Sequence, residues 1–432
     1  MSMQPDASNG HDAPGLPTVT PPSGKFIAQL FLIPGLIVVG VVGVIWFVTW
    51  LVGGFFTPES FLEDLRSPNP EVRWRRASDL AQFLTRDDQL ASNPKFALDL
   101  ADLLQDSFED SPRVEREGAE RARSKTRSVT ERTEPFKGDV FTEEQSGAED
   151  PTLRHERNYL RFLISCNGHF VVPASAPVLG EIATAKPEGV PADVTLRRQR
   201  LAVFALANLG ENLKRFDRLP APDRDRVLTE LHTEIEKAGP ARRQRARQTF
   251  ELLEARAAGK HETIGIDKTL IQSAGSDDPM LRKFTAMALT FWRGNPEENA
   301  RMEEALVKLT QDDGHGSTEQ QPQHALEIRF QAVRGLAERG SSKTPVPLIG
   351  EMLDQPRLEE VLRARVEGRD VGVDAPLVAS VLTSGLKCVT ALARNKTSLD
   401  LSKLVPAIEK LTQSDNRAVR TEAERTLLAL KS

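Results

Sequence analysis

Two stretches far apart in the chain, NPEVRWRRASDLAQFL (69–84) and DPMLRKFTAMALTFW (278–292), share one pattern. Each opens with Asn or Asp followed by proline, and carries Val or Leu two residues and arginine three residues after that proline. An alanine follows seven residues after the proline and a leucine ten residues after it. Asn and Asp cap the free N–H groups of a helix start, where proline costs no hydrogen bond. The pattern therefore predicts two equivalent helices in separate parts of the protein.

The shared positions have the character of packing positions. The apolar residues and the alanine fall roughly on one helical face, and the small alanine lets a neighbouring helix approach closely. Weaker copies of the pattern occur elsewhere, for example after Asp150. The predicted structural repeat residues are Pro70, Val72, Arg73, Ala77, Leu80, Pro151, Arg154, Arg197, Pro279, Leu281, Arg282, Ala286, Leu289, Arg329 and Arg420.

A second amphipathic helix is expected before several of these copies. The expected segments are 58–65, 175–185, 222–238, 296–310, 344–353 and 399–411. Measured between the pattern arginines, one step is 43 residues, from Arg154 to Arg197, and another is 47 residues, from Arg282 to Arg329. Repeats of about 40 to 47 residues that contain two helices are typical of HEAT and armadillo arrays.

The pattern D-P-x-V-R-x-x-x-A-x-x-L resembles the second helix of a HEAT repeat. The resemblance spans residues 59–432 and implies an all-α, right-handed, armadillo-like solenoid of about eight antiparallel helix pairs. In that family the arginine commonly bonds to an acidic residue of an adjoining repeat, so the six pattern arginines are expected to be ladder residues. The helix expected over 375–394 lacks such an arginine, and Asn158 replaces the alanine of the copy after Asp150.

The run FIAQLFLIPGLIVVGVVGVIWFVTWLVGGFF (26–56) contains 31 residues and no charged side chain. Because a helix crosses the bilayer with roughly 20 apolar residues, the run predicts one transmembrane helix and a single-pass membrane protein. A cleaved signal peptide is the alternative, although the apolar stretch is longer than the usual hydrophobic region. Lys25 precedes the run, and the excess of arginines after it predicts that the solenoid is cytoplasmic. Those arginines are Arg66, Arg73, Arg75 and Arg76.

Composition changes along the chain predict its organisation. Residues 1–25 form a disordered tail rich in Pro, Ser and Gly, 26–56 the transmembrane helix, and 57–108 the first HEAT-like helices. Residues 109–149 form a charged flexible insertion, within which a solvated helix over 114–127 is the alternative. The HEAT-like solenoid then occupies 150–432, with a smaller projecting insertion at 356–374.

The composition gives little support to nucleic-acid binding or to metal chemistry. With 62 acidic and 57 basic residues the net charge is -5, so no overall positive field gathers phosphates. Cys166 and Cys388 are far apart and signal neither a disulfide framework nor a zinc site. Cys166 and His169 share the sequence CNGH, but nothing nearby completes a catalytic or metal-binding arrangement. We expect no enzyme activity and no cofactor.

Other histidine and acidic groups keep an enzyme open as an alternative. The dipeptides His155-Glu156 and His261-Glu262 resemble the paired motifs with which HEAT-like di-iron hydroxylases bind metal, but that family needs four pairs. The segment DDGH (312–315) has metal-ligand residue types within a polar loop. The alternative function is thus a metal-dependent or lyase-type enzyme on a HEAT-like fold.

The strongest candidate binding site is basic. If these arginines align on one face of the solenoid, they would hold an acidic peptide or anionic lipid headgroups. The candidate residues are Arg197, Arg198, Arg200, Arg242, Arg243, Arg245 and Arg247. The alternative is a solvated face paired with acidic neighbours. The favoured function is a membrane-anchored scaffold that binds a protein partner in the solenoid groove, and the other alternative is a binder of anionic lipid or nucleic acid through this region.

Overall fold

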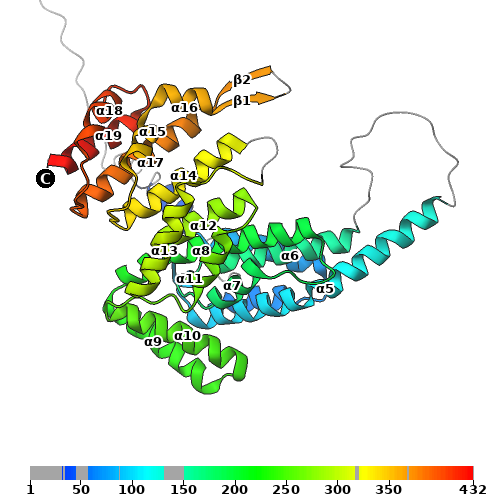
Figure 1. Ribbon diagram of the computed structural model, residues 1–432. Helices are drawn as coiled ribbons and strands as arrows, with labels where there is room; N and C mark the ends of the chain where they lie inside the picture. The colour runs from blue at the N-terminus through cyan, green and yellow to red at the C-terminus, as the bar shows by residue number, and fades with distance from the viewer. Residues whose placement is uncertain are drawn as a thin grey trace, which may run out of the picture. The chain divides into compact units, whose positions relative to one another are not determined.

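The protein is all-α, as predicted, and the computed structural model describes residues 32, 35–44, 57–86, 88–130, 150–316, 321–366 and 369–431. The chain divides into two compact units, Met1–Ser60 and Phe61–Ser432. Figure 1 labels the helices and strands. They are α2 (Pro58–Leu65), α3 (Pro70–Leu84), α4 (Asp88–Ala91), α5 (Pro94–Thr130), α6 (Pro151–Asn167), α7 (Ala176–Thr184), α8 (Ala192–Arg218), α9 (Ala221–Lys237), α10 (Pro240–Ala257), α11 (Ile266–Ala274), α12 (Pro279–Phe291), α13 (Pro296–Leu309), α14 (Gln321–Glu338), α15 (Val346–Leu353), α16 (Gln355–Val361), β1 (Arg363–Val366), β2 (Arg369–Val373), α17 (Ala375–Arg394), the 3₁₀ helix η2 (Ser402–Leu404), α18 (Val405–Leu411) and α19 (Arg417–Lys431).

The predicted caps start their helices. The Asn69 side chain accepts a hydrogen bond from the backbone N–H of Glu71 at 2.9 Å, and Asp278 accepts one from Leu281 at 2.7 Å. Asp150 caps α6 in the same way, and in all three helices proline follows the cap. These acceptors satisfy N–H groups that the first helical turn leaves free.

The larger unit contains a row of helices in which each member packs on the next. In chain order the row is α3, α6, α8, α12, α14, α17 and α19. A second set of helices pairs with members of this row, in the combinations α5 with α6, α7 with α8, α11 with α12, α13 with α14, α15 with α17 and α18 with α19. The first member of each pair covers one side of its row helix.

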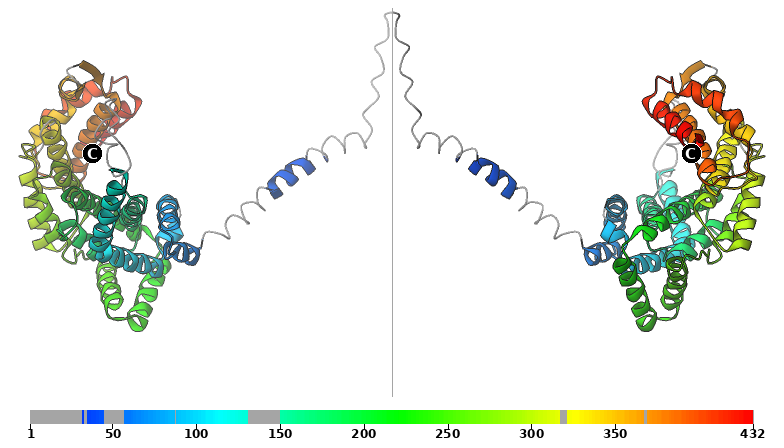
Figure 2. Two further views of the ribbon diagram at one scale, coloured as in Figure 1. Left: turned by 90° about the vertical axis from the view of Figure 1, so that its right-hand side faces the viewer. Right: turned by 90° about the vertical axis from the view of Figure 1, so that its left-hand side faces the viewer.

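The pair α9 and α10 leaves this row, although the segment 222–238 was expected to form a helix of the repeat array. Helix α8 packs directly on α12, while α9 and α10 pack on each other and against α5. Figure 1 and both views of Figure 2 show the pair projecting from the remaining helices. The physical reason is the small apolar surface of these helices. Only Val227 and Leu231 of α9 are buried, and α10 buries chiefly Ala246, Leu252 and Leu253.

Helix α5 continues through the start of the segment expected to be a flexible insertion. It extends from Pro94 to Thr130, so the part of that segment before residue 131 is helical, close to the alternative of a helix over 114–127. Part of this extension is packed, because Ser111 and Glu115 are 4% and 3% exposed. Residues 131–149, like the expected tail at 1–25, lie outside the described residues.

The described part of the predicted transmembrane run contains an apolar helix over Gly35–Val44. The large apolar side chains there are 52–69% exposed. Most of the predicted span lies outside the described residues, so it stays a prediction. Among described helices, α17 is long and apolar enough to cross a membrane. Since Leu382, Leu386 and Val389 lie in the C-terminal hydrophobic cluster, α17 serves as a core helix.

The smaller expected insertion, 356–374, contains most of α16 and a two-stranded antiparallel hairpin. In the register of β1 and β2, Arg363 pairs with Val373, and the pairing shifts between Ala364 and Arg365. The hairpin projects beyond α16 (Figure 1).

Candidate functional site

Arg198, one of the predicted binding arginines, is buried in a cluster with α5 and α6. Its guanidinium donates to Glu115 Oε1 at 2.8 Å and to the Ser111 hydroxyl at 3.1 Å. Arg157 donates to Glu115 Oε2 at 2.6 Å, so one carboxylate serves two arginines. With Arg198 8% exposed and Glu115 3% exposed, the cluster holds three helices together and leaves Arg198 inaccessible to a partner.

Arg242 and Arg245, on α10, also bind carboxylates of α5. Arg242 donates to Asp99 Oδ1 and Asp102 Oδ2, both at 2.8 Å, and to Glu234 at 2.9 Å. Arg245 forms an ion pair with Asp102. Burial alone would lower the pKa of Arg242, but the three carboxylates outweigh it and raise that pKa. These contacts hold the α9–α10 pair to α5.

The other candidates are closer to solvent. Arg200 donates to Asp278 Oδ1 at 2.9 Å, which joins α8 to the cap of α12. Arg197 pairs with Asp193 of its own helix, and Arg243 donates to the carbonyl of Ala238. Arg247 is exposed.

The candidate arginines of α8 and those of α10 do not form one continuous basic surface along α5. Their partners on that helix, Asp102 and Glu115, are 13 residues apart in the sequence, which is roughly 20 Å along a helix. The predicted set therefore consists mainly of arginines that join helices to one another.

Three of the expected ladder arginines reach acidic residues on neighbouring helices or just beyond them. Arg73 of α3 pairs with Glu156 of α6. Arg282, 1% exposed, donates to Asp312, which follows α13, at 2.6 Å. The longest of the three contacts joins Arg329 of α14 to Glu351 of α15 at 3.8 Å.

The other pattern positions differ in how deeply they are buried. Arg154 is exposed, and Arg420 donates to the carbonyl of Ser414. Val72, expected to pack, is 39% exposed because it lies near the start of α3 and outside the stripe formed by Ala77 and Leu80. The remaining apolar positions are buried to 0–3% exposure, namely Ala77, Leu80, Leu281, Ala286 and Leu289.

The CNGH segment lacks the electrostatics of an activated nucleophile. Cys166 is fully buried, and its thiol donates to the carbonyl of Ala77 at 3.3 Å. Burial raises the pKa of the Cys166 thiol far above its usual value and lowers the pKa of His169. A reactive cysteine needs the opposite shift, toward the thiolate.

The possible metal ligands already have other partners. Glu156 pairs with Arg73, and His155 stacks on Trp74 with ring centroids 5.8 Å apart. Asp312, Asp313 and His315 lie close together, but Asp312 accepts hydrogen bonds from Arg282 and from the backbone of Gly314. The hydrogen bonds around Asp312 satisfy its charge without a metal ion.

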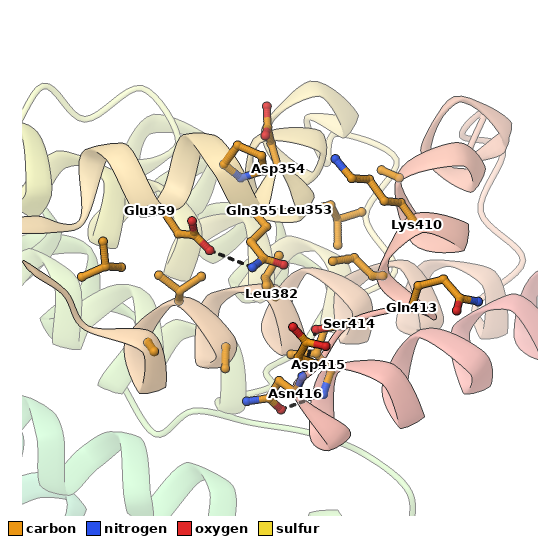
Figure 3. A pocket seen from close by; sticks show the side chains of 18 of the residues that line it. Leu353, Asp354, Gln355, Glu359, Leu382, Lys410, Gln413, Ser414, Asp415 and Asn416 are labelled. Atoms are coloured by element: carbon orange, nitrogen blue, oxygen red, sulfur yellow. Dashed lines mark hydrogen bonds between the residues drawn. The ribbon is translucent and has the colours of Figure 1, made fainter.

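A cavity of about 830 Å³ opens between α15, α16, α17 and the connection from α18 to α19 (Figure 3). Leu353 and Leu382 contribute to its apolar floor. Its rim includes the acidic Glu359 and Asp415 and the basic Lys410. Glu359 accepts a hydrogen bond from the Gln355 side chain at 2.7 Å. The charged lining residues are therefore mainly acidic, namely Asp354, Glu359 and Asp415 against Lys410.

A surface that the sequence reasoning missed lies on the solvent side of three row helices. We call it the α6–α8–α12 face, and it consists of Arg154, Arg161, Phe162, Phe204, Phe284 and Met287. Phe204 is 37% exposed, and its ring meets that of Phe284 edge-on with centroids 5.3 Å apart. Arg161 lies over the Phe162 ring at 5.9 Å. The available signal was the spacing of seven residues from Arg154 to Arg161, which places both on one side of α6.

No protein-family model and no curated protein matches the chain. Among solved structures, the chain is similar to an engineered protein determined by the Northeast Structural Genomics Consortium, at 17% identity over 87% of this chain and 89% of that chain. The TM-score of 0.25 is too low for this likeness to carry an argument about fold or function.

Proposed function

We propose that the chain is a single-pass membrane protein whose larger unit is a HEAT-like α-solenoid that binds a protein or peptide partner and carries out no chemistry itself. The observation that carries the proposal is the row of helices from α3 to α19, in which each member packs on the next and the members from α6 onward each pair with a second helix. Such an arrangement offers an extended surface, because each repeat contacts only its neighbours.

The membrane anchor is supported by the uncharged run 26–56 and by the exposure of its described part. Val39, for example, is 69% exposed within the apolar helix Gly35–Val44. Water is a poor environment for such a helix, whereas lipid satisfies it without a protein partner. The substitution Val39→Arg in the full chain is expected to reduce retention in carbonate-washed membranes. Retention at the level of the unmodified chain would argue against an anchor here.

The proposed orientation places the solenoid on the cytoplasmic side. Arg66 and Arg75 keep side chains that are 57% and 65% exposed, so they remain available for the positive-inside effect. Arg73 and Arg76 are more closely engaged with Glu156 and Asp64. A cysteine-reactive, membrane-impermeant label directed to an added C-terminal cysteine in intact cells tests the side. Labelling before lysis would overturn the orientation.

The scaffold function is tested by proximity labelling from the C-terminus of the full chain, followed by chemical crosslinking of the enriched proteins. Reproducible crosslinks from one partner to solvent-facing row residues support the proposal. The enzyme alternative would be favoured instead if the purified protein contained stoichiometric iron or zinc and if removal of that metal abolished a measurable turnover.

A further inference from the structure

The chemical character of a partner can be deduced from the α6–α8–α12 face. Helices α6, α8 and α12 pack side by side, and α5, α7 and α11 pair with them on their buried sides. Their solvent faces therefore adjoin. Axes of packed helices lie about 8–10 Å apart, so the face is about 16–20 Å wide. That width fits roughly five or six residues of an extended peptide.

The centre of this face is apolar. Phe204 is exposed, Phe284 and Met287 are half-buried, and the edge-on ring contact joins α8 to α12. At the α6 side, Phe162 stacks on Trp74 of α3 with centroids 6.4 Å apart and planes inclined by 19°. Aromatic rings held by neighbouring rings offer rigid contact area and lose little entropy when a partner binds.

The charges that border the face are unevenly balanced. Arg197 is paired with Asp193, and Lys283 donates to Glu327 at 2.8 Å. Within the described part of the chain, the exposed Arg154 and Arg161 have no carboxylate partner. They stand two helical turns apart, about 10 Å, on the same side of α6. The unmatched positive charge therefore lies at the α6 side of the face, while the exposed Glu211 lies two turns beyond Phe204 on α8.

These observations favour a peptide over a membrane or a nucleic acid. Recognition of anionic lipid by surface charge uses clusters of about four to eight basic residues, and this face offers two unmatched arginines. Proteins that bind nucleic acid neutralise many phosphates with basic residues, and the two unmatched arginines of this face are too few for that.

We propose that the α6–α8–α12 face binds an acidic peptide segment of a partner protein, with partner carboxylates on Arg154 and Arg161 and partner aromatic or aliphatic side chains on Phe204, Phe284 and Met287. This inference rests on the proposed scaffold function and names the partner chemistry for it. Arginine recognises carboxylates through paired N–H donors, and aromatic anchors dominate the energetics of peptide interfaces.

The test starts with selection of a displayed library of random dodecapeptides against the full chain in nanodiscs of neutral lipid. Enriched peptides are then synthesised with a fluorophore, and their dissociation constants are measured by anisotropy. The expected peptides carry net negative charge and contain Phe, Trp or Leu. Enrichment of basic or charge-neutral peptides would overturn the inference.

Variants locate the binding site. The double substitution Arg154→Glu and Arg161→Glu is expected to weaken binding on the order of tenfold, because it replaces two attractions with repulsions. Phe204→Ala is expected to weaken it about fivefold. The matched control is Arg243→Glu with Arg247→Glu, two exposed arginines of α10 outside the face, with an expected change below about twofold. Thermal melting by circular dichroism verifies that the arginine variants, which alter only exposed side chains, remain folded.

The outcomes separate this inference from the function on which it rests. If the dissociation constants of the selected peptides are unchanged in both face variants, the peptides bind elsewhere on the protein. That result overturns this inference but is compatible with the proposed scaffold function. Absence of any enriched peptide, together with failure of proximity labelling, would overturn both. Titration with dihexanoyl phosphatidylserine covers the lipid case. Saturable binding that the Arg154 and Arg161 variant abolishes would assign the face to lipid headgroups and overturn the peptide inference.

Discussion

Glu115 in α5 and Leu386 in α17 are both almost completely buried, yet they stabilise their regions by different interactions. Around Glu115, α5, α6 and α8 are joined by buried ion pairs from Arg157 and Arg198, and α10 joins α5 in a similar way. Around Leu386, α14 to α19 form one apolar cluster, where the ion pair of Arg329 with Glu351 is 3.8 Å long and partly exposed. Directional ion pairs and non-directional apolar contacts therefore both hold helices of the same unit together.

The largest effect is expected from Glu115→Ala. The substitution leaves Arg157 and Arg198 without their carboxylate, and breaking a buried ion pair costs about 3–5 kcal/mol. Urea denaturation of the full chain measures the change in unfolding free energy. The control is Glu117→Ala on the same helix, whose exposed pairs with Arg113 and Arg121 are worth at most about 1 kcal/mol. Equal losses of unfolding free energy for the two variants would show that the buried ion pairs around Glu115 do not stabilise this region more than exposed ones.

A slightly smaller effect is expected from Leu386→Ala in the apolar region. Removing this side chain creates a cavity, with a cost of about 3 kcal/mol. Because no charge is involved, that cost is expected to stay the same between low and high salt in urea denaturation. Leu428→Ala on α19, where the side chain is 69% exposed, is the control and is expected to change little. A strong salt dependence for Leu386→Ala would show that the two regions do not differ as described.

Asp102→Asn is expected to loosen the α9–α10 pair without unfolding the row. It removes the carboxylate shared by Arg242 and Arg245, while Asp99 and Glu234 keep Arg242 partly satisfied. The cost is about 1–2 kcal/mol. Hydrogen exchange is expected to rise in α9 and α10 and to stay unchanged in α12 and α14. Asp225→Asn, an exposed carboxylate on α9, provides the comparison.

The smallest change in stability is expected at Asp267 of α11, a helix that lies in the sequence between the region around Glu115 and the region around Leu386. Burial alone would raise the pKa of Asp267, but hydrogen bonds from Arg301 and Thr263 outweigh it and hold the pKa below 3.8. A carboxyl with a lowered folded-state pKa stabilises the fold above its unfolded pKa and loses that contribution as the pH falls through the folded value. The stability difference between the unmodified chain and Asp267→Asn should therefore shrink between pH 6 and pH 2. A constant difference would contradict the assignment.

The local part of this fold was predictable because its determinants are local. Asn69, Asp150 and Asp278 each precede a proline, and each starts a helix with its side chain on a free N–H group. The buried stripe of Ala286 and Leu289 follows from spacing alone. The path of α5 was harder to predict, since its charged composition resembles a solvated segment, whereas Glu115 is buried by arginines that come from elsewhere in the chain.

The candidate binding arginines show the same difference between what local sequence reveals and what depends on distant residues. The seven predicted binding arginines were identified by their charge, but charge alone does not reveal whether a carboxylate from another helix lies opposite. Asp99 and Asp102 face Arg242 across 140 or more residues of sequence. Arg154, expected to be a ladder residue, instead remains exposed and is part of the face for which we propose peptide binding.

That the chain is helical, and where most of its helices begin, follows from local sequence, because capping, proline placement and apolar spacing act within a few residues. Long-range packing, by contrast, places α8 on α12 past the α9–α10 pair. It also sets which arginines have a carboxylate opposite them and which remain exposed without one. Those outcomes depend on which groups separated by many residues are brought together, and electrostatic energy depends on that separation in space and on the surrounding solvent.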